Sequence, residues 1–246
     1  MDGKCELLCQ KVIGKTLKSH LLEGLRFSTW LLIFFQVALA LEVAQRKFYF
    51  THYDLHVGNI VIADWPKNRI LDIDLGNYTY RISSVTQVPT VIDFETSSIK
   101  YRGRSLGSHN YTNSGILHFP IAGHDLYRLL VSSYIHAKCK KTKTQIRKLF
   151  EMFRYIDPYQ VNNKGIGGLK DAARTYCKEL AFSKVASVTP ALVLEYLQQK
   201  YSAYFHGFIH KQLKTYDQIA VTFDNDSLVE KLKSLLQTQD SGYLLP

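Results

Sequence analysis

The sequence predicts an α+β fold that is mainly α-helical, and three features of its hydropathy pattern lead to this prediction. A long apolar segment over residues 28–47 has the length and composition of a helix. Short strand-like segments separated by turn residues follow between residues 60 and 92. Helical periodicity returns after residue 123. Apolar residues make up 46% of the 246 residues, which is enough for a substantial hydrophobic core.

The individual elements follow from periodicity and from turn and capping residues. Strands are predicted over 4–14, 60–63, 70–73, 78–82 and 90–92. Helices are predicted over 16–25, 28–47, 123–137, 144–155, 169–180, 190–201 and 227–237. Gly76 and Asn77 are expected to form a two-residue hairpin turn, and Ser28 and Thr189 to cap the helices that follow them. The segment 93–120 has no clear period and is expected to be a long surface loop.

The most apolar run of the chain, residues 30–44, is expected to lie in the core. Gln36 and Glu42 interrupt it, and it is shorter than the ~20 residues that span a bilayer. Apolar side chains nearly encircle the predicted helix, so it should be buried on most sides. The sequence therefore predicts a core helix and no membrane partner.

The strongest chemical signal is the polar loop that precedes the strand at 60–63. It contains His52, Asp54 two residues later and Asn59 five residues after that. Protein kinases use this spacing in their catalytic loop. The Asp must accept or orient the acceptor hydroxyl, and the Asn must reach a metal ion on the phosphates, so one tight loop fixes their separation. Asp54 and Asn59 are therefore the candidate catalytic residues, with Asn59 also a metal ligand.

Two aspartates compete for the second metal position. Asp93 ends a strand and precedes Phe94, as the metal-binding Asp of kinases does, but Glu95 stands where kinases have Gly. Asp74 also ends a strand and keeps the glycine, as Gly76. Asp93 is favoured, because it leads into a long irregular segment whereas Asp74 leads into a hairpin. Glu95 restricts the backbone and raises doubt about catalysis.

Asp125 stands near the start of the predicted helix 123–137. Kinases place an Asp at this position, and its carboxylate accepts backbone N–H groups of the catalytic loop that burial would otherwise leave without partners. Asp125 and His52 are therefore expected to support the loop structurally.

His56 stands where serine/threonine kinases carry Lys, two residues after Asp54. A His there looks like aminoglycoside phosphotransferases and other atypical kinases, which makes His56 a candidate phosphate contact. The alternative is that His56 only forms hydrogen bonds within the loop.

The chain resembles the serine/threonine-protein-kinase-like proteins of large nucleocytoplasmic DNA viruses. The residues that carry the resemblance are 50–59, 76–80 and 88–94, and it extends over roughly 5–135. Those relatives have an inserted hairpin between the catalytic Asn and the metal Asp, which supports the choice of Asp93.

The resemblance implies a kinase-like large (C-terminal) lobe, ATP and Mg²⁺ as cofactors, and a protein substrate that receives a phosphoryl group. The implied organisation is a hinge at 1–14 and a large lobe at 15–246, with the catalytic loop at 52–59, an inserted hairpin at 64–89, an activation-type segment at 93–120 and a helical extension at 123–246.

Motifs of the small lobe of kinases are missing from the sequence. There is no Gly-x-Gly-x-x-Gly motif and no strand of the Val-Ala-Ile-Lys type. The small lobe is therefore expected to be mostly absent, the isolated chain to be inactive or incomplete, and a separate small-lobe partner to be possible. A pseudokinase or interaction module and a small-molecule phosphotransferase remain as alternatives.

The formal net charge is +10, but no nucleic-acid partner is expected. The densest basic stretch has no interleaved aromatic residues and predicts a solvated helix face; it comprises Lys138, Lys140, Lys141, Lys143, Arg147 and Lys148. Four cysteines without zinc-finger spacing suit a reducing compartment, so an intracellular location is expected, in the host cytoplasm or the virion if the protein is viral.

Overall fold

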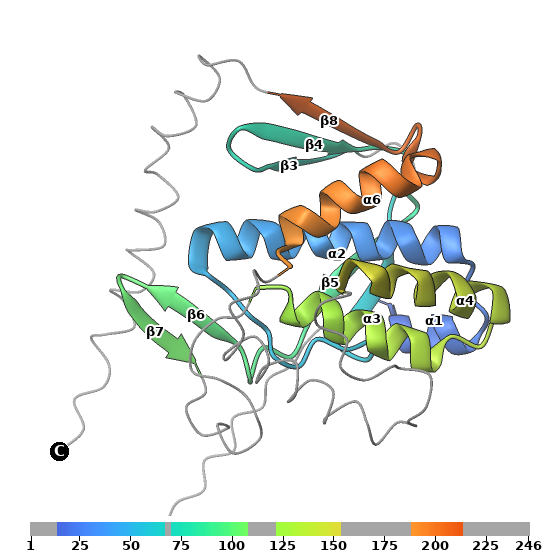
Figure 1. The fold of residues 1–246 in the computed structure, drawn as a ribbon, viewed down its shortest axis with the longest axis horizontal. Coiled ribbons are helices and arrows are strands. Elements are labelled where there is room, and N and C mark those ends of the chain that lie inside the picture. The colour runs from blue at the N-terminus through green and yellow to red at the C-terminus, as the bar shows by residue number, and fades with distance from the viewer. Residues whose placement is uncertain (1–13, 67–69, 108–121, 154–187, 214–246) are drawn as a thin grey trace, which may run out of the picture. The chain divides into compact units, whose positions relative to one another are not determined.

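The computed structural model describes residues 14–66, 70–107, 122–153 and 188–213. The chain forms two compact units, each with its own fold (Figure 1). The first unit comprises Met1–Arg69 and Ser84–Gly207, and the second Ile70–Ser83 and Phe208–Pro246. Helices and antiparallel sheets are both present, so the predicted α+β class is confirmed. The helices expected at 169–180 and 227–237, and most of the strand at 4–14, lie outside the described residues.

The core of the first unit is built around α2 (Phe27–Phe48). This helix packs against α6 (Pro190–Phe205), with the Phe35 and Phe205 ring centroids 4.7 Å apart. α2 is long and apolar enough to cross a membrane, yet 67% of its most apolar window is buried inside the protein. The prediction of a core helix is therefore confirmed. The helix begins at Phe27 with Arg26 as its N-cap, so the predicted capping role of Ser28 is wrong.

Short elements join α2 to a three-stranded antiparallel sheet. β1 (Lys15–Thr16) leads into α1 (Leu17–Leu22), which ends in a Schellman motif at Gly24 with a left-handed φ of 97°. The sheet has the order β1-β2-β5, with β2 at Ile60–Asp64 and β5 at Gln87–Val91. Since Ile60 pairs with Val91, the two segments adjoining these residues are brought together.

The second unit is a three-stranded antiparallel sheet of the order β3-β4-β8. Its strands are β3 (Leu71–Asp74), β4 (Tyr78–Ile82) and β8 (Ile209–Leu213). The N–H of Leu75 donates to the Tyr78 carbonyl at 3.0 Å and closes the predicted turn at Gly76 and Asn77, where Gly76 has a φ of 83°. β8 was not predicted: it lies between the helices expected at 190–201 and 227–237, within a segment expected to be a helical extension.

A β-hairpin stands where a long irregular loop was predicted. β6 (Ser98–Tyr101) pairs with β7 (Arg104–Gly107), and Tyr101 lies opposite Arg104. The two turn residues, Arg102 and Gly103, have positive φ angles of 49° and 78°, which match the right-handed twist of a tight hairpin. The prediction of a structureless segment is therefore wrong over these residues.

The remaining described helices belong to the first unit. α3 (His124–His136) and the capped start of α6 at Thr189 agree with the predictions. α4 (Lys140–Lys148) begins four residues earlier than predicted and continues into the 3₁₀ helix η2 (Leu149–Phe153). The exposed basic residues of α4 lie opposite its buried Thr142 and Ile146.

Candidate active site

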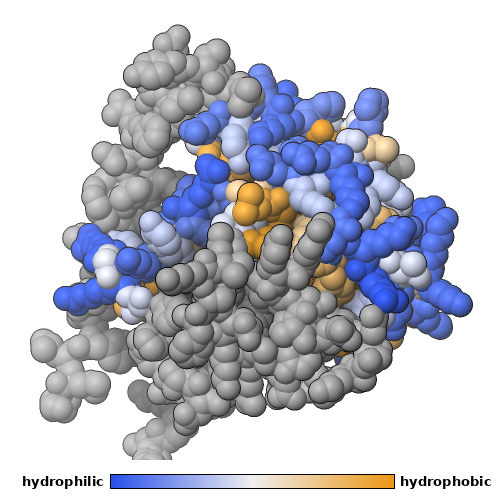
Figure 2. All heavy atoms as spheres, viewed as in Figure 1, coloured by the Kyte–Doolittle hydropathy of each residue, from blue (hydrophilic) through white to orange (hydrophobic). Residues whose placement is uncertain are grey.

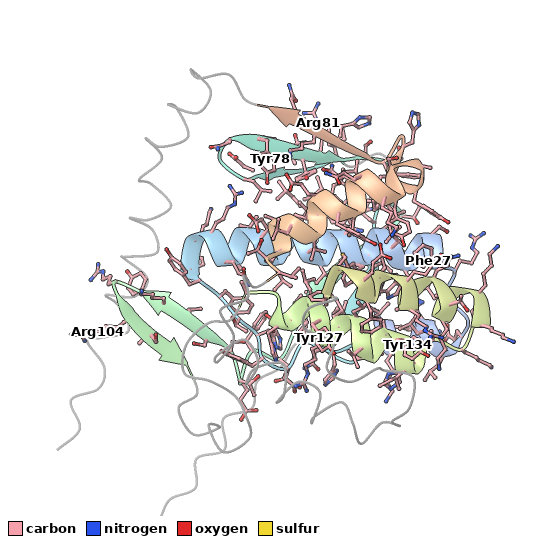
Figure 3. All side chains as sticks on the ribbon, in the orientation of Figure 1. Phe27, Tyr78, Arg81, Arg104, Tyr127 and Tyr134 are labelled. Atoms are coloured by element: carbon pink, nitrogen blue, oxygen red, sulfur yellow. The ribbon has the colours of Figure 1, made fainter. Side chains whose placement is uncertain are left out.

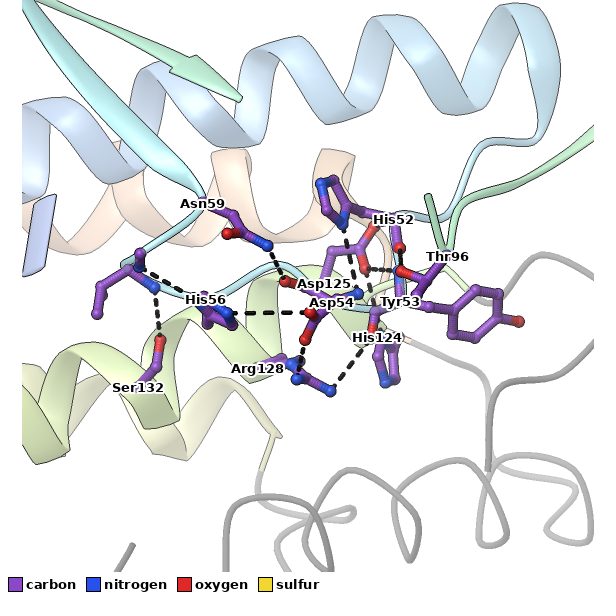
Figure 4. A network of polar contacts seen from close by, with 12 residues as sticks. His52, Tyr53, Asp54, His56, Asn59, Thr96, His124, Asp125, Arg128 and Ser132 are labelled. Carbon is purple, nitrogen blue, oxygen red and sulfur yellow. Dashed lines mark hydrogen bonds and ion pairs between the residues drawn. The ribbon is translucent and has the colours of Figure 1, made fainter. Parts of the chain in front are cut away.

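The loop predicted to be catalytic lies along one face of α3 (Figure 4). Asp125, Arg128 and Ser132 are spaced three and four residues apart, so they share a helical face. The Asp125 carboxylate accepts hydrogen bonds from the backbone N–H groups of His52 at 2.7 Å and Tyr53 at 3.0 Å. These are the hydrogen bonds that the sequence led us to expect of Asp125.

Arg128 and Ser132 attach the rest of the loop to the same helix. Arg128 donates through Nη1 to the Tyr53 carbonyl at 3.2 Å and pairs through Nη2 with the Asp54 carboxylate. Ser132 Oγ accepts from the Val57 N–H at 3.2 Å. Because buried N–H and C=O groups need partners, these contacts fix the loop backbone along its length. Sequence analysis missed both residues, although polar residues spaced along one face of a buried helix were a usable signal.

His52 connects the loop to the segment after β5. Its Nδ1 accepts from the Asp54 N–H at 3.3 Å, so Nε2 carries the proton and donates to the Ile92 carbonyl at 2.9 Å. The Thr96 hydroxyl donates to the His52 carbonyl at 2.8 Å. The His52 side chain is fully buried. It therefore acts as a structural link between the two segments, the supporting role expected from the sequence.

Asp54 lies at the surface of this network. Its side chain is 31% exposed, with Oδ1 paired to Arg128. The other oxygen, Oδ2, lies 3.9 Å from Nε2 of His56. The ion pair with Arg128 fixes the orientation of the carboxylate and leaves Oδ2 as the atom able to accept a proton from an incoming hydroxyl.

Asn59 is held at the other end of the loop. Its Nδ2 donates to the Asp54 carbonyl at 3.1 Å, and its own backbone N–H donates to the His56 carbonyl at 2.9 Å. The Asn59 carbonyl accepts from the Ile92 N–H at 3.0 Å, immediately before Asp93. With Nδ2 used, Oδ1 is the side-chain atom that can serve as a ligand for a hard cation.

Asp93 follows directly on the two contacts that Ile92 makes with the loop, and its side chain is exposed. Asp93 and Tyr53 both have left-handed backbone, with φ angles of 66° and 63°. Such a conformation is costly for a residue with a side chain and clusters at functional sites. Phe94 is 55% exposed, and its ring lies 5.3 Å from that of His52.

The rival aspartate, Asp74, has a different local role. It ends β3 in the second unit, and its Oδ1 accepts from the Gly76 N–H at 2.8 Å. The carboxylate therefore stabilises the turn of its own hairpin.

His56 folds back onto the loop backbone. Its Nδ1 accepts from the Gly58 N–H at 3.0 Å, so the hydrogen bond within the loop is present and Nε2 carries the proton. A Cβ on Gly58 would lie 2.8 Å from Cε1 of His56, so a larger residue there would displace the His56 ring from this position. Burial lowers the pKa of His56 below its usual value of 6.5, and this effect outweighs the opposing charge of Asp54. The Asp93 carboxylate opposes this lowering of the pKa of His56, as Asp54 does.

Together, a His-x-Asp loop held by a buried Asp on α3 and a second Asp that closely follows a neighbouring strand are typical of a protein-kinase-like protein. Residues 4–128 match the family model described as "Haspin like kinase domain", and the chain belongs to this family. It is similar to "Probable kinase 098L" of Invertebrate iridescent virus 3, with 28% identity over 242 residues. The predicted resemblance to viral kinase-like proteins is confirmed. The match covers 95% of this chain and 43% of the relative, so the chain spans less than half the relative's length.

Proposed function

We propose that the protein transfers the γ-phosphoryl group of ATP to a serine or threonine hydroxyl of a protein substrate. The observation that carries this proposal is the attachment of Asp54 and Asn59 to one loop whose backbone is bound by Asp125, Arg128 and Ser132. Catalysis of phosphoryl transfer consists mainly of positioning and charge stabilisation, and a loop held at several points provides the first of these.

In the proposed reaction the acceptor hydroxyl oxygen forms a bond to the γ-phosphorus. The bond from that phosphorus to the β–γ bridging oxygen breaks, and its electron pair leaves with ADP. The hydroxyl proton passes to Oδ2 of Asp54, since Oδ1 is engaged by Arg128. His56 carries its proton on Nε2, which lies 3.9 Å from Oδ2 of Asp54. The His56 ring is therefore a hydrogen-bond donor close to the proposed acceptor site, and this is the basis for proposing it as a phosphate contact.

The proposed metal ligands are Oδ1 of Asn59 and the carboxylate of Asp93. Among the described residues no group of three or more His, Cys, Asp or Glu gathers as a metal cage. One or two protein oxygens fit Mg²⁺, which usually keeps several waters and shares phosphate oxygens. When bound, Mg²⁺ neutralises charge that develops on the phosphates. The exposed Asp93 and the free amide oxygen of Asn59 suit this donor set.

The proposal includes a requirement for a small lobe. The groups described here act on the acceptor and metal side of the γ-phosphate, whereas kinases hold the phosphates from above with a glycine-rich flap and a Lys. The sequence contains neither motif. We therefore expect negligible turnover by the 246-residue chain alone, and activity when a small lobe is supplied in cis or by a partner protein.

The test is transfer of labelled γ-phosphate to a generic protein substrate, with the chain alone and with a small lobe supplied. Activity should appear only in the second case and disappear in Asp54→Ala. Robust, Asp54-dependent turnover by the chain alone would contradict the small-lobe requirement. Turnover that survives Asp54→Ala would contradict the assigned site.

A non-catalytic interaction module is the second candidate, and Glu95 favours it. Glu95 stands where kinases have Gly, so it restricts the backbone after Phe94 and adds negative charge beside the proposed metal ligand Asp93. Absence of transfer in the presence of a small lobe, together with retained folding, would select this function.

A further inference from the structure

The β6–β7 hairpin carries a group of three exposed cationic side chains. Lys100, Arg102 and Arg104 are all exposed, and none makes an ion pair with a described carboxylate. The sequence from 96 to 124 contains no Asp or Glu at all. Lys100 lies 5.7 Å from the Tyr49 ring centroid, and this aromatic contact keeps the charge at the surface. Figure 2 shows the hairpin as hydrophilic, and Figure 3 shows Arg104 at its outer edge.

The base of this hairpin is bound to the catalytic loop. The N–H of Thr51 donates to the Ser98 carbonyl at 2.9 Å, and the N–H of Ser98 donates to the Thr51 carbonyl at 2.8 Å. Gly107 packs closely on the same base, because a Cβ there would lie 2.7 Å from the Ser97 carbonyl oxygen. The hairpin is therefore fixed to the residue that precedes His52.

Chain geometry then limits the distance from the hairpin cations to the acceptor site. Asp54 lies three residues after Thr51, and Arg102 lies four residues after Ser98. At about 3.4 Å per extended residue and about 5 Å across the bridge, Arg102 lies within about 30 Å of Asp54, and Lys100 within about 22 Å. An extended substrate advances about 3.3 Å per residue, so these distances correspond to fewer than about nine residues from the acceptor.

We propose that the β6–β7 hairpin binds acidic side chains of the protein substrate, either carboxylates or phosphorylated residues, that lie near the acceptor hydroxyl. This inference rests on the proposed function, because it takes Asp54 as the acceptor site. Arg and Lys are the residues that pair with carboxylate and phosphate groups. A peptide is favoured over nucleic acid because the hairpin is bonded to the residue that precedes His52 and carries only three such cations, whereas non-specific nucleic-acid binding usually relies on more phosphate contacts.

The test measures binding of fluorescent peptides by anisotropy, without nucleotide. Four peptides share a central Ser and differ in the residues that flank it, which are Glu, phosphoserine, Ala or Lys. The hairpin variant carries Lys100→Gln, Arg102→Gln and Arg104→Gln. A matched control carries Lys140→Gln, Lys141→Gln and Arg147→Gln, which removes the same charge from the exposed side of α4.

The native protein and the α4 control should bind the acidic peptides about tenfold more tightly than the Ala peptide, the effect expected of three exposed ion pairs. The hairpin variant should lose this preference. Equal losses in the two variants, or no preference in the native protein, would overturn the inference. So would hairpin-dependent binding of single-stranded DNA that is tighter than binding of an acidic peptide of equal charge.

Phosphate transfer, measured with a small lobe supplied, separates this inference from the proposed function. Asp54→Ala should keep the acidic preference in binding while losing transfer. If transfer is absent throughout but hairpin-dependent binding persists, the proposed function fails alone. If transfer proceeds equally on the acidic and Ala peptides, and binding shows no preference, the hairpin inference fails alone.

Discussion

Asp93 lies two residues after the end of β5, Asp74 is the last residue of β3, and each is followed by an apolar residue, yet their surroundings differ. After β5, Ile92 accepts from Nε2 of His52 and donates to the Asn59 carbonyl, so Asp93 emerges beside the catalytic loop. After β3, Asp74 accepts from the N–H of Gly76 in its own turn.

The difference shows that a short motif is less informative than the hydrogen bonds around it. Asp74 keeps the Gly of the kinase motif and Asp93 does not. However, only Asp93 is adjacent to backbone groups that bond to His52 and Asn59. Pairing of β2 with β5 is what brings these segments together, and Asp74 stands on a different sheet.

The largest effect is expected from Asp125→Ala, which would break the attachment of the loop at 52–59 to α3. The substitution leaves the N–H groups of His52 and Tyr53 without their buried acceptor. We expect a loss of about 1–3 kcal/mol in the free energy of unfolding. Asp74→Ala, at an exposed turn, should cost less than about 1 kcal/mol. Denaturant titration of both variants checks this, and an unchanged unfolding midpoint in Asp125→Ala would contradict the role of Asp125.

The next effect concerns nucleotide binding. Asp93→Asn removes a proposed metal ligand and should weaken binding of MgATP about tenfold or more, since a neutral amide replaces an anionic oxygen. Asp74→Asn should leave binding unchanged, because its carboxylate serves a turn. Calorimetric titration with MgATP distinguishes the two variants. The reverse pattern would assign the metal role to Asp74.

Sequence predicted the parts of the structure that local pattern determines. The loop from His52 to Asn59, the core helix α2 and the turn at Gly76 follow from spacing, hydropathy and turn chemistry. The hairpin β6–β7 was missed because Ser-Ile-Lys-Tyr alternates over four residues only and Arg-Ser-Leu-Gly has no clear apolar alternation. β8 was missed because its pairing with β4 is formed across more than a hundred residues of sequence.

The residues of the candidate site also divide into those that a local sequence pattern predicted and those that were missed. The positions of His52, Asp54 and Asn59 were predicted from their spacing in one short loop, and that of Asp125 from its place near the start of the helix that follows. Arg128 was missed, because the helical face that it shares with Asp125 was not searched for further contacts to the loop. The roles of Asn59 and Asp93 as metal ligands stay predictions.

A smaller difference in stability is expected between loss of the Arg128–Asp54 pair and loss of the Arg81–Asp72 pair. Arg128→Met removes a partly buried pair to Asp54 and a donor to the Tyr53 carbonyl, so a loss of about 1–2 kcal/mol of stability is expected. Arg81→Met removes the exposed pair to Asp72 in the second unit, which should change stability much less, because water solvates both of these charged groups. Thermal unfolding of the two variants provides the comparison. Equal losses would show that the Arg128 pair contributes no more than a surface pair does.

The smallest effect is a pH dependence that belongs to the catalytic loop. Burial lowers the pKa of His56 below 6.5, so the folded protein favours the neutral ring. Between the folded pKa and 6.5 the unfolded chain binds more protons than the folded one. The contribution of His56 to stability is therefore fully present above pH 6.5 and is lost as the pH falls through the folded value. The effect is modest, because the side chain is 37% exposed.

His56→Gln should flatten the change in melting temperature between pH 7.5 and 5 without altering the acid transition of the second unit. In that unit a hydrogen bond from Arg81 lowers the pKa of Asp72 below 3.8, so its stabilising contribution is present above that value and is lost at lower pH. The two regions therefore titrate in separate windows, one below 6.5 and one below 3.8. An NMR titration of the His56 ring gives its pKa directly. A value above 6.5 would mean that the charge of Asp54, 3.9 Å away, outweighs burial and that His56 faces the phosphates as a cation.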